Sequence, residues 1–124
     1  MPLDIICVDD NKTQLKIFEA HLKDQDYMVE YFENPEDALE RLKTEVPKLL
    51  VLDLLMPGIT GEELLMKFSE YKNWSGMKIL VVTGSDVDKT KVFTLATLGV
   101  HEVLTKPIHP DAFRAKIESM IDAA

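Results

Sequence analysis

The chain has 124 residues, of which 46% are hydrophobic and 29% are charged, a size and composition typical of a single globular domain. Lysine and arginine number 14 against 22 aspartates and glutamates, which leaves a formal net charge of −8. Because negative charge repels phosphate backbones, we expect no direct nucleic-acid binding. No apolar run approaches the ~20 residues of a membrane span, and the one cysteine, Cys7, has no disulfide partner within the chain. We therefore expect a cytoplasmic protein, not embedded in a membrane, whose residues 1–124 form one domain.

Short apolar runs alternate with longer segments of helical periodicity along the whole chain. Two of the runs, residues 49–52 and 79–82, are unbroken, as expected of strands that are buried on both faces. Such alternation is typical of a parallel sheet covered by helices on both sides. We expect five strands, at residues 3–8, 27–31, 49–52, 78–82 and 101–105.

The segments between and after these strands carry apolar residues three and four positions apart, on one face of a helix. Four such stripes are Leu15, Phe18 and Leu22; Ala38, Leu39 and Leu42; Leu64, Leu65 and Phe68; and Phe113, Ile117, Met120 and Ile121. Helix start signals are Asn11 with Gln14, Asn34 with Pro35, Thr60 with Glu63, and Ser85 with Asp88. Another helix is expected over Val87 to Leu98, ended by Gly99 in a left-handed conformation. These elements predict an α/β domain with an open, doubly wound sheet.

Five polar residues stand directly after the predicted strands. Asp9 and Asp10 follow the first strand, and the others are Asp53, Thr83 and Lys106, after the third, fourth and fifth. Taken singly, each suits a helix start, a turn or a solvated surface. Ligands of open parallel sheets, however, bind outside the carboxyl ends of the strands, and all five residues occupy such ends. We expect three carboxylates, a hydroxyl and an ammonium to converge in one crevice.

Carboxylates gathered in this way need a compensating proton or cation. Two unit charges ~4 Å apart repel by about 4 kcal/mol at an effective dielectric of ~20. Mg²⁺, which keeps several waters, suits a few carboxylates, whereas no cysteine or histidine pair stands at zinc-ligand spacing. A metal beside one carboxylate prepares it to meet a phosphoryl group, and an aspartate can serve as the covalent acceptor.

Four motifs resemble, in order and spacing, the receiver domains of two-component response regulators. They are Val8-Asp9-Asp10-Asn11, Val51-Leu52-Asp53-Leu54-Leu55-Met56-Pro57-Gly58 with Gly61 following, Val81-Val82-Thr83-Gly84, and Leu104-Thr105-Lys106-Pro107. The match runs across essentially the whole chain. It implies a flavodoxin-like (βα)5 three-layer sandwich with a parallel five-stranded sheet in the order 2-1-3-4-5. It also implies a cis peptide bond between Lys106 and Pro107, because proline greatly reduces the cis penalty.

The resemblance further implies how the carboxylates are used. Asp53 is the phosphoacceptor, which takes its phosphoryl group from a histidine kinase or a histidine phosphotransfer protein. Asp10, Asp53 and the backbone carbonyl of Leu55 bind Mg²⁺, and Asp9 assists through the water shell of the metal.

Receiver domains act as switches, and the resemblance implies the same here. Lys106 pairs with the phosphoryl oxygens, and Thr83 moves inward to hydrogen-bond them. The switch remodels the face made by the fourth helix, fifth strand and fifth helix, which controls a downstream protein or an attached output domain in a monomer or a phosphorylation-dependent dimer. Val103 stands where the family usually has Tyr or Phe, and valine has no ring to swing.

Three alternative functions fit parts of the pattern. A phosphohydrolase of the haloacid-dehalogenase type needs a second aspartate two residues after the nucleophile, where this chain has Leu55. A flavodoxin-like nucleotide binder needs hydroxyls and glycines after the first strand, where Asp9 and Asp10 repel phosphate. A docking receiver that takes no phosphate would not need the five residues. We expect no enzyme with an external substrate, only a domain that catalyses its own phosphorylation and dephosphorylation.

Overall fold

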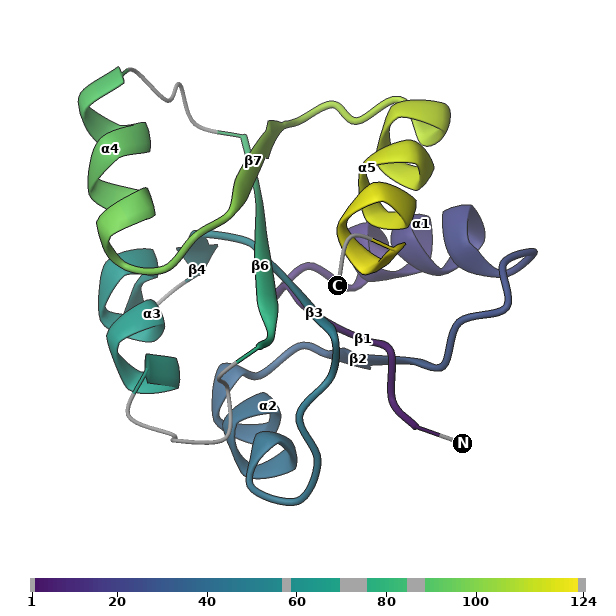
Figure 1. The fold of residues 1–124 in the computed structure, drawn as a ribbon, viewed down its shortest axis with the longest axis horizontal. Helices are drawn as coiled ribbons and strands as arrows, with labels where there is room; N and C mark the ends of the chain where they lie inside the picture. The colour runs from purple at the N-terminus through teal and green to yellow at the C-terminus, as the bar shows by residue number, and fades with distance from the viewer. Residues whose placement is uncertain (1, 57–58, 70–75, 85–88, 123–124) are drawn as a thin grey trace.

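The computed structural model describes residues 2–56, 59–69, 76–84 and 89–122 as one α/β fold (Figure 1). Its strands are β1 (Ile5–Val8), β2 (Val29–Phe32), β3 (Leu49–Leu52), β4 (Leu55–Met56), β5 (Ile59–Thr60), β6 (Lys78–Thr83) and β7 (Glu102–Thr105). Its helices are α1 (Lys12–Leu22), α2 (Pro35–Leu42), α3 (Gly61–Ser69), α4 (Lys89–Thr97) and α5 (Pro110–Asp122). Within the described ranges, no helix has the length and apolarity needed to cross a membrane.

Five strands form one parallel sheet in the order β2-β1-β3-β6-β7. Counted along the chain, this is the predicted order 2-1-3-4-5, so the fold prediction is confirmed. The strand β3 has the expected bounds, and the ends of the other four strands differ by one or two residues from those expected, because a strand extends only as far as a neighbour pairs with it. Thus β2 begins at Val29, opposite Ile5, and ends at Phe32, opposite Val8.

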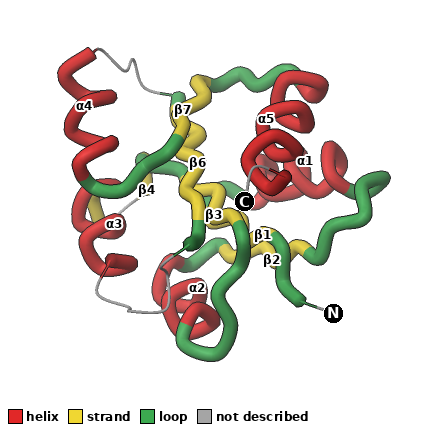
Figure 2. Tube along the Cα trace, viewed as in Figure 1, coloured by secondary structure: helices red, strands yellow, loops and turns green. Residues whose placement is uncertain are grey.

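Helices cover both faces of the sheet, as Figure 2 shows with red helices around the yellow strands. Alternate residues of a strand point to opposite faces, so Ile6 and Val8 join one buried cluster while Ile5 and Cys7 join the other. The first cluster contains the apolar stripes of α2 and α3 with Leu95 of α4. The second contains those of α1 and α5. The predicted three layers are therefore present.

Two of the predicted helix starts are confirmed by side-chain caps. The side chain of Asn11 accepts hydrogen bonds from the backbone N–H groups of Thr13 and Gln14, and Asn34 does the same for Glu36. Such caps satisfy N–H groups that have no partner within the helix. The Ser85 and Asp88 signal and the Thr60 side chain lie outside what the structure describes.

The sequence pattern predicted how α4 ends, but it did not predict a short hairpin. Gly99 follows α4 with φ 97°, the left-handed conformation expected of it. The short antiparallel hairpin of β4 and β5 was not predicted. Strands of two residues are too short to show an alternating pattern.

Candidate functional site

The candidate site begins where β1 and β3 end, at the carboxyl edge of the sheet. The backbone N–H of Asp53 donates to the carbonyl of Val8 at 3.1 Å, and that of Asp9 donates to the carbonyl of Phe32 at 3.1 Å. The ladder of hydrogen bonds between the strands thus continues one residue into the site and fixes the backbone positions of Asp9 and Asp53. Asp9 is fully buried and Asp53 is 5% exposed, so neither carboxylate is well solvated.

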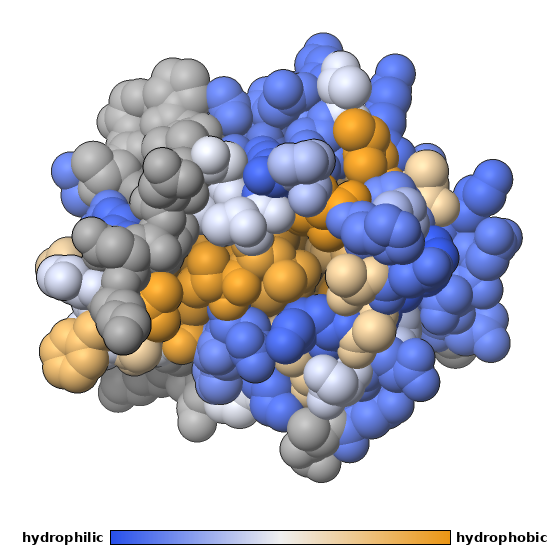
Figure 3. Space-filling view, turned by 90° about the horizontal axis from the view of Figure 1, so that it is seen from above, coloured by the Kyte–Doolittle hydropathy of each residue, from blue (hydrophilic) through white to orange (hydrophobic). Residues whose placement is uncertain are grey.

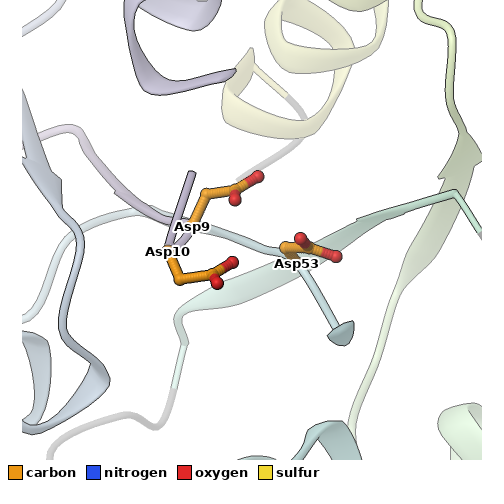
Figure 4. Close-up of side chains that lie close together, drawn as sticks. All are labelled: Asp9, Asp10 and Asp53. Carbon is orange, nitrogen blue, oxygen red and sulfur yellow. The ribbon is translucent and has the colours of Figure 1, made fainter. Parts of the chain in front are cut away.

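Three carboxylates gather at this edge. Oxygen atoms of Asp9, Asp10 and Asp53 lie within 4.8 Å of one another, and Figure 4 shows Asp9 and Asp10 directed toward the side on which Asp53 lies. Asp10 is exposed, which leaves the cluster open to solvent on its side. Hard oxygen donors with one solvent-facing side fit a divalent ion that keeps some of its waters. This part of the structure could therefore bind a metal ion.

Lys106 supplies the positive charge that the structure places against these carboxylates. Its Nζ atom lies 3.2 Å from an oxygen of Asp9 and 3.3 Å from an oxygen of Asp53. Its backbone N–H donates to the carbonyl of Thr83 at 2.8 Å, which ties the start of the loop after β7 to the end of β6. The Lys106–Pro107 peptide bond is cis, as predicted.

Burial and neighbouring charge act together on Asp9. Burial raises the pKa of the Asp9 carboxyl above its ordinary value, because the charged form loses hydration. A hydrogen bond from the backbone N–H of Asn11, 3.0 Å long, lowers the pKa. The charge of Asp53 raises it further, and Lys106 opposes that rise. A cation that entered the cluster would favour the charged carboxylate.

The remaining predicted residues lie at the same edge of the sheet. Thr83 is fully buried and is the last residue of β6. The sheet register pairs Val8 with Leu52 and Leu52 with Val81, so Thr83 stands one residue beyond the level of Asp9 and Asp53. Leu55 opens β4, directly after the loop that carries Asp53. Its side chain lies outside the described part of the chain.

The convergence of Lys106 with the carboxylates was predicted, but two specific contacts of the site were not. Lys106 was expected to meet phosphoryl oxygens, but it is also shared between Asp9 and Asp53. Asn11 was expected only as a helix cap, but its backbone N–H also holds Asp9. Aspartate side chains often accept the backbone N–H two residues further on, in an Asx-turn, so the presence of an aspartate at position 9 is the sequence signal for that second contact.

The fold and the acidic edge of the sheet together define a receiver domain. Residues 5–118 match the model of the family described as "Response regulator receiver domain". The chain belongs to that family. It is therefore a phosphoacceptor domain of two-component signalling, a class of domain that works with histidine kinases.

Individual proteins agree with this assignment. The chain is 30% identical over 117 residues to the "Alkaline phosphatase synthesis transcriptional regulatory protein PhoP" of Bacillus subtilis, covering 94% of this chain and 48% of that protein. It is 26% identical to "Protein PilH" of Pseudomonas aeruginosa, covering 94% and 96% of the two chains. A solved CheY-like receiver domain from Methanospirillum hungatei superposes with a TM-score of 0.87 at 26% identity, covering 99% and 96%. The chain thus spans about half the length of the PhoP protein and nearly all of the other two.

Proposed function

We propose that Asp53 is the residue that receives the phosphoryl group. The observation that carries this proposal is the position of its carboxylate, which shares the Lys106 ammonium with Asp9 and lies within 4.8 Å of oxygens of both Asp9 and Asp10. Asp9 has no exposed surface, whereas Asp53 retains 5%. Of the two carboxylates that contact Lys106, Asp53 is therefore the more accessible to a phosphoryl donor.

The transfer is a displacement at phosphorus. An oxygen of Asp53 forms the new O–P bond while the P–N bond of a phosphohistidine breaks, and the imidazole nitrogen of the donor keeps the electron pair of that bond. The product is an acyl phosphate on Asp53. Lys106, already 3.3 Å from the attacking carboxylate, stabilises negative charge on the transferred oxygens. The hydroxyl of Thr83 donates a hydrogen bond to the same group after transfer.

The acidic cluster fits Mg²⁺ as the cofactor of this reaction. Asp10, Asp53 and the backbone carbonyl of Leu55 would hold the ion, and Asp9 would contact its water shell. When bound, Mg²⁺ neutralises the phosphoryl oxygens and favours in-line displacement. The supporting observation is the donor set, which consists of carboxylate oxygens with one exposed member.

Phosphorylation then switches the face formed by α4, β7 and α5. The coupling begins at Thr83, because the segment after it leads into α4 and because its carbonyl accepts the backbone N–H of Lys106, directly after β7. The output is a downstream protein or an attached output domain, in a monomer or a phosphorylation-dependent dimer. We propose that residues 1–124 are one receiver domain in the cytoplasm, without direct nucleic-acid binding and without an external substrate to turn over. The donor is a histidine kinase or a histidine phosphotransfer protein.

The test uses acetyl phosphate as donor and intact-protein mass as readout, with and without Mg²⁺. Native protein is expected to gain one phosphoryl group only when Mg²⁺ is present, and Asp53→Ala to gain none. Asp24→Ala is the matched control, because Asp24 is an exposed acidic residue beyond α1, and it should behave as the native protein. An equal mass gain in Asp53→Ala would exclude Asp53 as acceptor. Turnover of p-nitrophenyl phosphate that depends on Asp53 would instead indicate a phosphohydrolase.

A further inference from the structure

The turn between β1 and α1 joins the acidic cluster to the start of a helix. The backbone N–H of Asp9 donates to the carbonyl of Phe32 at 3.1 Å, and the backbone N–H of Asn11 donates to Oδ1 of Asp9 at 3.0 Å. Asp10 is the single residue between Asp9 and Asn11. Hydrogen bonds therefore hold both ends of a short turn that carries two of the three carboxylates of the cluster.

Each oxygen of the Asp9 carboxylate meets a donor of the protein. Oδ1 accepts the backbone N–H of Asn11, and Oδ2 lies 3.2 Å from Nζ of Lys106. The lysine is a flexible side chain that also contacts Asp53, whereas the donor of Asn11 belongs to the backbone. Because Asp9 is fully buried, bulk water does not replace either donor. The N–H of Asn11 is therefore the rigid contact that sets how the Asp9 carboxylate is turned.

The side chain of Asn11 in turn fixes the position of this N–H. Its Oδ1 accepts the backbone N–H groups of Thr13 at 2.9 Å and Gln14 at 3.2 Å, and its carbonyl accepts that of Leu15 at 3.1 Å. These bonds hold Asn11 in an extended conformation, with φ −92° and ψ 111°, at the start of α1. A residue without a side-chain acceptor leaves this position less well held. One side chain thus determines where the N–H that binds Asp9 points.

Asn11 has this influence from the surface of the molecule. The residue is exposed, and in Figure 3 hydrophilic side chains cover most of the side on which α1 and α5 lie in Figure 1. Asn11 belongs to neither of the two buried apolar clusters. A substitution at this position therefore acts on the site through the turn and not through the packing of the core.

We propose that Asn11 is a positioning residue for the Mg²⁺ site, which acts through the orientation of Asp9 and the backbone of Asp10. With the cap in place, both carboxylates are held in the cluster before an ion arrives, so that little ordering remains to be done on binding. Without the cap, the turn adopts other conformations and binding has to order it. Loss of the cap therefore weakens the affinity for Mg²⁺. The inference rests on the proposed function in one respect, since that function assigns Mg²⁺ to the cluster.

The matched control for Asn11 is Asn34, at the start of α2. Asn34 is also an exposed asparagine in an extended conformation, with φ −111° and ψ 120°, and its side chain accepts the backbone N–H of Glu36 at 2.8 Å. It neighbours none of the three aspartates in the chain. Asn11→Ala and Asn34→Ala each remove one helix cap, so both should lower the urea midpoint of unfolding.

The test is a titration of metal-free ¹⁵N-labelled protein with MgCl₂, followed by NMR at the backbone amides of the cluster. Asn11→Ala is expected to raise the Kd for Mg²⁺ by about three- to tenfold, less than the ~10–100-fold of groups that orient direct ligands, because Asp9 is proposed to contact only the water shell. Asn34→Ala should leave the Kd unchanged. An equal change of Kd in the two variants, or none in Asn11→Ala, would overturn the proposal.

A conservative variant tests the role of the cap itself. Serine caps helices about as well as asparagine, so Asn11→Ser should keep the Kd within about twofold of the native value. Hydrogen exchange at the amide of residue 11 reports the contact with Asp9. It should be slow in native protein and in Asn11→Ser, and several times faster in Asn11→Ala. A Kd in Asn11→Ser as weak as that in Asn11→Ala would contradict the role of the cap.

The outcomes distinguish this inference from the proposed function. If native protein binds no Mg²⁺ at the cluster, this inference is overturned. If Asp53 accepts a phosphoryl group but Asn11→Ala binds Mg²⁺ as the native protein does, only this inference fails. If Mg²⁺ binding depends on Asn11 but Asp53→Ala still gains a phosphoryl group from acetyl phosphate, only the assignment of the phosphoacceptor fails.

Discussion

The charge of one lysine holds two buried carboxylates together at the site. Lys106 lies 3.2 Å from Asp9 and 3.3 Å from Asp53, while its own side chain is 24% exposed. Removing one partner from a buried ionic group costs several kcal/mol, because the remaining charge has neither water nor a counter-ion. We therefore expect the stability of the metal-free domain to depend on Lys106 more than on any exposed ion pair of the described residues.

Lys106→Met should lower the free energy of unfolding without Mg²⁺ by about 1–3 kcal/mol at neutral pH. The range is below the ~3–5 kcal/mol of a fully buried pair, because the lysine is partly exposed. Addition of Mg²⁺ should recover much of the loss, since the ion supplies the missing positive charge. Urea unfolding with and without MgCl₂ measures both effects.

Lys48→Met, which removes an exposed lysine 3.5 Å from Asp4, is the control and should change stability by less than ~1 kcal/mol. Equal stability of Lys106→Met and native protein would contradict this view of the site.

Asp9→Asn should instead raise the free energy of unfolding without Mg²⁺. Asparagine keeps an oxygen that can accept the N–H of Asn11, removes one buried negative charge, and leaves Lys106 paired with Asp53. We expect the metal-free protein to gain about 1 kcal/mol of stability, because a buried carboxylate is costly even when paired. The same urea measurement should show a smaller gain from Mg²⁺ than in native protein. A loss of stability in this variant would mean that the Asp9–Lys106 contact outweighs the repulsion from Asp53.

At the scale of elements, α1 and α5 pack through aromatic contacts. The rings of Phe18 and Phe113 stack with centroids 5.0 Å apart, and the ring of His21 meets Phe113 edge-on at 5.9 Å. Partial burial lowers the pKa of His21 below its ordinary value, and the nearby charges of Arg114 and His109 lower it further. Packing of this pair of helices therefore favours the neutral imidazole.

This shift predicts how acid affects the α1–α5 contact. In the unfolded chain His21 titrates near 6.5, so as pH falls below that value the unfolded state binds the proton first and stability declines. The glutamine in the variant His21→Gln cannot take up that proton. Between pH 6.5 and the lowered pKa of His21 in the folded protein, the stability of the variant should therefore fall less than that of the native protein. Because the ring is only partly buried, the difference should stay below ~1 kcal/mol. Urea midpoints of the two proteins across pH 5–8 measure it, and parallel curves would contradict the assignment.

The elements also show where sequence patterns predict structure and where they do not. Unbroken apolar runs predicted β3 with both of its ends, because the strand is buried on both faces and paired on both sides. The start of β7 was predicted at His101 but lies at Glu102. There the imidazole of His101, in place of a backbone carbonyl, accepts the N–H of Ile79. The pattern of apolar residues in a sequence does not show where a side chain takes the place of a backbone hydrogen bond between strands.

At the scale of the whole molecule, the order of the strands brings distant residues together at one edge. Asp9, Asp53 and Lys106 were predicted to converge because they follow strands of one parallel sheet, and the structure does bring them together. Their roles in phosphoryl transfer remain predictions. The cavity of about 210 Å³ between α4 and β7, lined in part by Val92, Ala96 and Val103, was not predicted, because its shape depends on which residues of α4 face β7. That arrangement depends on the packing of the helix, which a hydrophobic stripe does not determine uniquely.

The carboxylates of Asp9, Asp10 and Asp53 come together only in the folded molecule. We therefore predict that Mg²⁺ stabilises the whole domain. An ion that binds the folded but not the unfolded chain stabilises it by RT ln(1 + [L]/Kd), or ~2.7 kcal/mol at a concentration of 100 Kd. The melting temperature should therefore rise steadily with MgCl₂. Sodium chloride at equal ionic strength should raise it much less, because screening acts on all the surface charges and not on the cluster. Asp10→Asn should weaken the Mg²⁺ effect severalfold, since it removes the exposed ligand and leaves the buried pair of Asp9 and Asp53 with Lys106. A shift that the two salts reproduce equally at matched ionic strength would show that the acidic edge does not hold the ion.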